Sequence, residues 1–135
     1  MKIKSLLFIF LTLLLCAGCS NNVPISGQVT YSDDGNPLTT GTVCFQTESF
    51  VARGNLQSDG TYHMSSVTEK DGLPSGLYQI SVINAVEGLG EDDGIRIPLI
   101  DPKYNDSATS GITFEVTRSN KRFNFTVDRY KPVKR

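Results

Sequence analysis

The sequence has little of what enzymes and nucleic-acid-binding proteins commonly depend on. Its 135 residues include no tryptophan, one histidine and three cysteines. Thirteen basic and 14 acidic residues give a formal net charge of −1, so no global positive field favours nucleic acid. Hydrophobic residues make up 39% and charged residues 20%, which excludes a disordered or collagen-like chain. The length predicts one globular domain.

Residues 1–18 have the organisation of a secretory signal peptide. Lys2 and Lys4 give a positive start, and a mainly apolar run extends from Leu6 to Cys16. This run of 11 residues is too short for a transmembrane helix, which needs about 20. Ala17 and Gly18 are small residues of the kind that precedes a cleavage site.

The segment Ala17-Gly18-Cys19 resembles the end of a bacterial lipoprotein signal, although Cys16 stands where that pattern prefers leucine. The resemblance implies cleavage before Cys19, a thioether-linked diacylglycerol on its sulfur and a further acyl chain on its amino group. Two or three chains give a lasting anchor, whereas a single myristoyl chain binds only marginally. Ser20 follows, where aspartate would favour the inner membrane, so we expect the outer membrane if the cell has one.

The cysteine count then predicts a mature domain without an internal disulfide. Cys16 leaves with the signal and Cys19 carries lipid, so Cys44 remains alone. No electropositive group lies next to Cys44 in the sequence to activate it. We therefore interpret Cys44 as a small buried hydrophobic residue.

Alternation of apolar and polar residues with period two predicts short strands, each with one face toward a core. Seven such segments occur, at 25–31, 43–45, 51–56, 61–65, 78–82, 112–117 and 122–127. Turn residues such as Asp33-Asp34-Gly35-Asn36-Pro37 and Ser58-Asp59-Gly60 separate them. We predict a seven-stranded antiparallel β-sandwich over residues 25–128, with a lipidated tether at 19–24 and a basic tail at 129–135.

The stretch 84–110 differs from the rest because it is long and rich in glycine, proline and acidic residues. Residues 95–100 are compatible with a short edge strand, with Pro98 confined to an edge. A connection of this length is often a binding loop. Its candidate ligand residues are Glu87, Glu91, Asp92 and Asp93. Their spacing does not match an EF-hand, and a solvated acidic loop is the alternative to a calcium site.

The order of strand and turn motifs resembles the transthyretin-like, carboxypeptidase-regulatory-like β-sandwich modules of bacterial lipoproteins. The resemblance is carried by Ile25-Ser26-Gly27-Gln28-Val29-Thr30-Tyr31, Gly35-Asn36-Pro37-Leu38, Gly41-Thr42-Val43-Cys44-Phe45, Ser58-Asp59-Gly60-Thr61-Tyr62, Pro74-Ser75-Gly76-Leu77-Tyr78, Ile100-Asp101-Pro102-Lys103-Tyr104, Ile112-Thr113-Phe114-Glu115-Val116 and Asn124-Phe125-Thr126-Val127. It implies a β-sandwich fold and an exported setting. It carries over no catalytic residues.

Charge is distributed unevenly along the mature chain. From Arg118 to the end there are seven basic residues and one acid, whereas residues 19–117 hold four basic and 13 acidic residues. The candidate contacts with anionic headgroups or acidic envelope polymers are Arg129, Lys131, Lys134 and Arg135. The alternatives are a solubilising tail and a tail that folds against the acidic loop.

These features predict a membrane-anchored exported lipoprotein that acts as a non-catalytic binding or structural module of the cell envelope. We expect no cofactor beyond the lipid, no metal, no nucleic acid, and a protein partner that pairs with exposed strand edges. His63 is expected on the solvent side of its strand, without the partners that a metal site or a general base needs. The alternatives are a ligand-binding module for calcium or carbohydrate that uses 84–110, an accessory domain of an envelope complex, and a hydrolase that uses His63.

Overall fold

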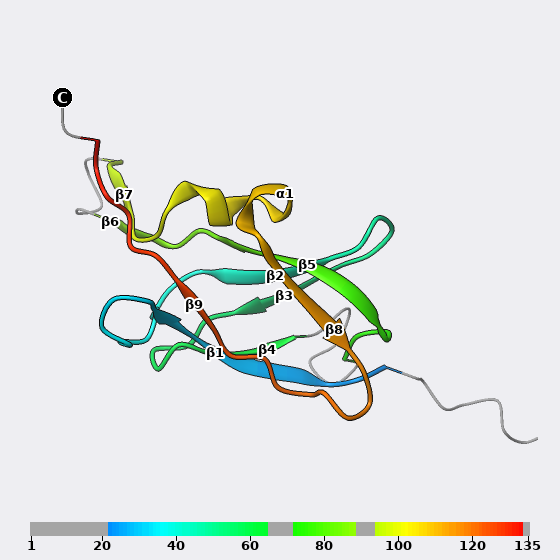
Figure 1. Ribbon diagram of the computed structural model, residues 1–135. Helices are drawn as coiled ribbons and strands as arrows, with labels where there is room; N and C mark the ends of the chain where they lie inside the picture. Colours follow the sequence, from blue (N-terminus) through cyan, green and yellow to red (C-terminus); the bar gives the residue numbers. More distant parts are fainter. Residues whose placement is uncertain (1–21, 65–71, 89–93, 134–135) are drawn as a thin grey trace, which may run out of the picture.

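The structure is a computed structural model that describes residues 22–64, 72–88 and 94–133. Strands dominate it, and two short helical segments follow the seventh strand (Figure 1). The elements in chain order are β1 (Ile25–Tyr31), β2 (Thr42–Gln46), β3 (Val51–Asn55), β4 (Thr61–Met64), β5 (Gly76–Ile83), β6 (Val86–Gly88), β7 (Arg96–Pro98), the 3-10 helix η1 (Pro102–Asn105), α1 (Ser107–Ser110), β8 (Ile112–Val116) and β9 (Phe125–Val127). Among the described residues, no helix is long and apolar enough to cross a membrane.

Two sheets face each other and form the sandwich predicted from the sequence. One sheet has the order β4-β1-β9 and the other β3-β2-β5-β8. The seven predicted segments correspond to these seven strands. Their burial alternates as expected, for instance along β1, where every second residue from Ile25 to Tyr31 is buried. The predicted fold class is therefore confirmed.

The expectation of purely antiparallel pairing was wrong at β9. β9 runs parallel to β1, with Val29 opposite Phe125 and Tyr31 opposite Val127. The chain crosses from β8 in one sheet to β9 in the other, and it meets β1 from Ser26 onward, where the Phe123 amide donates to the Ser26 carbonyl at 2.9 Å. A crossover between sheets, unlike a hairpin, leaves the direction of the arriving strand open.

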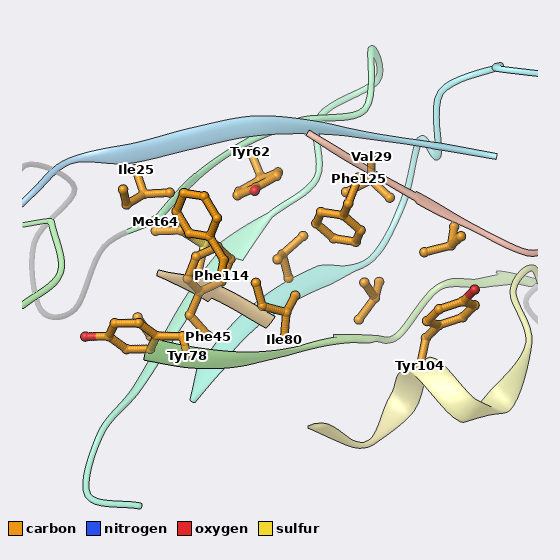
Figure 2. Packing of buried hydrophobic residues seen from close by; sticks show 14 of the residues in the cluster. Ile25, Val29, Phe45, Tyr62, Met64, Tyr78, Ile80, Tyr104, Phe114 and Phe125 are labelled. Atoms are coloured by element: carbon orange, nitrogen blue, oxygen red, sulfur yellow. The ribbon is translucent and has the colours of Figure 1, made fainter. Parts of the chain in front are cut away.

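Aromatic side chains occupy the centre of the core, between the two sheets (Figure 2). The Phe45 ring lies 6.0 to 6.4 Å, centroid to centroid, from the rings of Tyr62, Tyr78, Phe114 and Phe123. These tilted and edge-on geometries are those that aromatic quadrupoles favour. A core of this kind can hold the described part of the domain together without a disulfide among its residues.

A glycine permits the closest approach between β1 and the segment that leads into β9. A Cβ built on Gly27 would lie 1.8 Å from the Phe123 carbonyl oxygen, so no other residue fits there. The same carbonyl accepts a hydrogen bond from the Tyr62 hydroxyl at 2.6 Å. Burial raises the pKa of Tyr62, in keeping with a phenol that stays neutral and donates.

The stretch 84–110 is more structured than the long loop expected from its composition. β6 and β7 pair as a two-stranded antiparallel sheet of their own. The expected edge strand at 95–100 is thus present in shorter form, and its partner is β6. Two Asx caps then organise the helical turns, because the Asp101 carboxylate accepts from the Lys103 amide and the Asp106 carboxylate from the Ala108 amide, both at 2.9 Å.

The helical turns lie beside β5 (Figure 1) and bond to the sheet that contains it. The Ser110 hydroxyl donates to the Ile80 carbonyl, and the Ser107 hydroxyl lies 3.3 Å from the Gln46 amide oxygen. Cys44 lies opposite Ser81 in the sheet register, on the face turned away from the aromatic core, and both residues are buried. The interpretation of Cys44 as a buried free thiol is confirmed.

Candidate functional site

A hollow of about 340 Å³ opens where β5 ends and the β6–β7 hairpin begins. Aliphatic side chains make up most of its wall, and three polar side chains complete it. The lining residues are Ile83, Asn84, Ala85, Val86, Arg96, Pro98, Ile100 and Asn105. Seven of these eight fall within 84–110, the stretch that the sequence marked as a ligand loop. Its volume is at the low end for small-molecule sites, which span about 300–1,000 Å³.

The register of the hairpin determines which side chains reach the hollow. Val86 lies opposite Pro98, and Glu87 lies opposite Ile97. Because alternate residues of a strand point to the same face, Val86, Pro98 and Arg96 share one face, and all three line the hollow. Glu87 and Ile97 lie on the other face.

Asn84 turns the chain from β5 into the hairpin. Its φ of 57° is in the left-handed region, and no other non-glycine residue among the described ones has a positive φ. The Asn84 carbonyl accepts from the Val86 amide at 3.0 Å, and the next carbonyl, of Ala85, accepts from the Leu99 amide at 2.9 Å. Asparagine tolerates this conformation better than most residues. The turn places Asn84 among the residues that line the hollow.

Arg96 is the only charged residue among those that line the hollow. Its side chain is exposed, and within the described residues it forms no ion pair or hydrogen bond. The carboxamides of Asn84 and Asn105 are likewise without a described hydrogen-bond partner. The hollow therefore combines an aliphatic wall with one guanidinium and two carboxamides that have no side-chain partner among the described residues.

A second polar cluster fastens the C-terminal segment to the turn after β1. The Arg129 guanidinium lies 2.9 Å from the Asp33 carboxylate, 2.7 Å from that of Asp34, and 3.6 Å from the centroid of the Tyr31 ring. The Asn36 amide donates to the Asp34 carboxylate. This hydrogen bond, together with the nearby Arg129 guanidinium, lowers the pKa of Asp34. Each pair is partly exposed and contributes little alone, but together they fix where the tail begins.

Asp128 joins the same turn to η1. Its carboxylate accepts from the Ser32 hydroxyl at 2.6 Å, from the Lys103 ammonium at 3.0 Å and from the Tyr104 hydroxyl at 3.1 Å. These bonds, that of Ser32 foremost, lower the pKa of Asp128 to about 2. Since η1 ends at Asn105, the Asp128 cluster helps to hold one wall of the hollow in place.

Of the residues predicted from the sequence as sites, those within the described ranges are not brought together by the structure. Cys19, Glu91, Asp92, Asp93, Lys134 and Arg135 lie outside the described residues. Glu87 is exposed on the hairpin face away from the hollow, and Lys131 is exposed. Arg129, offered as a contact for anionic surfaces, is occupied by Asp33 and Asp34. Its acidic partner is the turn after β1, whereas the sequence suggested the loop 84–110.

The remaining candidates also stay apart. His63 is exposed on β4, as the alternation predicted. No group of three or more histidine, cysteine, aspartate or glutamate side chains that could hold a metal ion occurs in the described ranges. The stretch 84–110 was predicted as a ligand loop, but its lining residues Asn84, Arg96 and Asn105 were not, because they look like ordinary loop residues. The αL-tolerant Asn84 beside a strand end was the one available signal.

The hollow and the N-terminal end of the domain lie at opposite ends of the sandwich. The chain enters β1 at one end in Figure 1, whereas β6, β7 and the C-terminal segment lie together at the other. Contacts agree with this view. The Tyr130 amide donates to the Leu99 carbonyl at 3.1 Å, and Arg129 binds the turn that follows the end of β1.

No protein-family model and no curated protein sequence matches this chain. Among solved structures, the chain is similar to a variant of BcpA, the major pilin subunit of Bacillus cereus, with a TM-score of 0.52 at 16% identity. That likeness covers 82% of this chain and 30% of the pilin chain. A DUF3823 family protein from Bacteroides ovatus ATCC 8483 matches at a TM-score of 0.44 and 17% identity, over 81% of this chain and 45% of that one. The chain thus spans less than half the length of either protein, and the likeness to the pilin subunit extends to the β-rich fold alone.

Proposed function

We propose that this protein is an exported lipoprotein whose β-sandwich serves as a non-catalytic binding module of the cell envelope. In this proposal a lipid on Cys19 holds the domain at a membrane, the outer one where the cell has two. The hollow then faces away from that membrane and receives a ligand or a segment of a partner protein. The segment Ala17-Gly18-Cys19 supports the anchor, and the β-sandwich supports a compact body close behind it.

The observation that carries the proposal is that the chain enters β1 at the end of the sandwich opposite the β6–β7 hairpin, which contributes residues to the hollow (Figure 1). Residues 20–24 between the lipidated cysteine and the domain reach at most roughly 17 Å when fully extended. The seven residues of β1 then add about 20 Å at roughly 3.3 Å per residue. Electrostatic attraction to headgroups fades over about 8 Å at physiological ionic strength. In this proposal, Arg129 and the hollow, at the far end of β1, meet a partner beyond the membrane surface.

The chemistry of the hollow supports binding over catalysis. Arg96 is the one ionisable group among its lining residues. A guanidinium remains protonated in proteins and cannot exchange protons with a substrate near neutral pH. His63, the only histidine, is on β4, outside the set that lines the hollow. The described lining residues can therefore hold and orient a ligand, and none of them is a general base.

Mass spectrometry of the mature amino terminus tests the anchor. The chain expressed with its signal should begin at Cys19 and carry the added mass of diacylglycerol, and it should sediment with membranes. A Cys19→Ala variant should lose the added mass and the sedimentation, whereas a Cys44→Ala variant should keep both because Cys44 is buried and unmodified. An unmodified Cys19, or a mature chain that starts elsewhere, would refute the proposal.

A further inference from the structure

The hollow has two regions of different chemistry. One is aliphatic and includes the partly exposed residues Ile83, Val86 and Pro98, with the buried Ala85 and Ile100 behind them. No aromatic ring is among the described lining residues, so the stacking surface on which many sugars rely is missing there. The volume suits one residue-sized group and leaves no room for a long polymer.

The polar region offers a specific set of donors and acceptors. The Arg96 guanidinium presents paired N–H groups in a fixed fork, which matches a carboxylate in two parallel hydrogen bonds. A carboxamide donates and accepts at once, as a peptide group does. The carboxamides of Asn84 and Asn105 therefore complement the amide that precedes a terminal carboxylate. A simple fatty acid would use the guanidinium and leave both carboxamides without a partner.

We propose that the hollow binds the carboxy-terminal residue of a peptide, with an aliphatic side chain on that residue. The terminal carboxylate binds Arg96, and the last peptide group lies between Asn84 and Asn105. The aliphatic side chain packs against the wall that includes Ile83 and Val86. This inference rests on the proposed role as a binding module and names its ligand class. The hairpin register supports it, because Arg96 shares a face with Val86 and Pro98. A carboxylate and the apolar group next to it can therefore contact the same face of the hairpin.

The test is a titration of the ¹⁵N-labelled chain, purified from membranes in dodecyl maltoside, with acetyl-Gly-Val. We expect the amide resonances of Asn84, Ala85, Arg96 and Asn105 to shift. The same peptide with its carboxylate converted to an amide should bind at least about tenfold more weakly, because it loses the charge-assisted pair. Arg96→Gln should weaken the binding of acetyl-Gly-Val to the same extent and remove the difference in affinity between the acid and the amide peptide.

Matched variants separate this from a general loss of charge or structure. Arg53→Gln removes another exposed arginine, on β3, and should bind as the parent does. Arg96→Lys keeps the charge but loses the fork, so its affinity should lie between those of the parent and Arg96→Gln. Asn84→Gly keeps the backbone turn and removes one carboxamide. It should weaken the binding of the peptide and leave the binding of hexanoate unchanged.

Two results would overturn the inference. One is an absence of shifts at the hollow up to the solubility limit of the peptide. The other is hexanoate binding as tightly as acetyl-Gly-Val, which would leave an aliphatic acid as the ligand class. Neither result depends on the lipid on Cys19, which the mass measurement tests separately. Failure of the anchor and failure of this ligand class are thus distinguishable.

Discussion

Replacing Gly27 with alanine should destabilise the sandwich by an amount that the close approach of β1 to Phe123 predicts. The new Cβ would lie 1.8 Å from the Phe123 carbonyl oxygen and 2.7 Å from the Tyr62 hydroxyl oxygen. The chain around Phe123 must therefore move away from β1. That movement breaks the Tyr62–Phe123 hydrogen bond and strains the bond from the Phe123 amide to the Ser26 carbonyl.

The expected size follows from these two effects. Overpacking in a dense interior costs about 1–3 kcal/mol, and each lost hydrogen bond contributes about 0.5–1.5 kcal/mol. With one overpacked contact and one broken hydrogen bond, Gly27→Ala should lower the free energy of unfolding by roughly 1.5–4.5 kcal/mol. Tyr62→Phe, which removes one of the two bonds without a clash, should cost about 1 kcal/mol.

Urea unfolding in a Cys19→Ala background measures both. The protein has no tryptophan, so far-UV circular dichroism and tyrosine fluorescence are the signals. Gly88→Ala is the matched control, because a Cβ on Gly88 meets nothing within 4 Å, and its effect should stay within about 0.5 kcal/mol. If Gly27→Ala unfolds at the same urea concentration as Gly88→Ala, the proposed contact between β1 and Phe123 is refuted.

Three further perturbations test other parts of the structure. The pKa of Asp128 is lowered from 3.8 to about 2, so its carboxylate stabilises the fold above about pH 4, and this contribution is lost as the pH falls toward 2. The loss of folded protein with falling pH, followed by circular dichroism, should therefore be less steep in Asp128→Asn than in the parent. Superimposable pH profiles of the two proteins would contradict the cluster. Asn84→Ala should cost about 1 kcal/mol in urea unfolding through its left-handed backbone, whereas Asn84→Gly should cost little, and equal costs would argue against that conformation. With Cys16 and Cys19 replaced by serine, Cys44 should react with a thiol reagent only after unfolding, and rapid reaction of the native chain would show that it is not buried.

The strands were predictable because each carries its own signal. A half-buried strand must alternate, and the segments that became β1, β4 and β5 do so with turn residues between them. The exposure of His63 and the burial of Cys44 followed from the same pattern and from the scarcity of cysteine. The parallel direction of β9 had no such local signal, because it depends on a crossover between sheets.

The candidate site was largely unpredictable for a related reason. The hollow needs the hairpin register, and β6 and β7 are only three residues each, too short to show a period. The turn at Asp33 and Asp34 was recognised as turn chemistry, yet its pairing with Arg129 spans more than 90 residues of sequence. Charges that look solvated one by one can thus form a cluster that only the fold brings together.

The β6–β7 hairpin lies at the end of the sandwich opposite the start of β1, and energy transfer to a membrane measures directly whether the hairpin is the end farther from the bilayer. A donor dye on a Gly88→Cys or an Asn22→Cys variant, with the lipidated chain in vesicles that contain acceptor lipids, reports the distance of each end from the bilayer. Cys44 is buried and should stay unlabelled, and position 88 has open space for a dye. We predict efficient transfer from position 22 and clearly weaker transfer from position 88. Equal transfer from both positions would contradict the account.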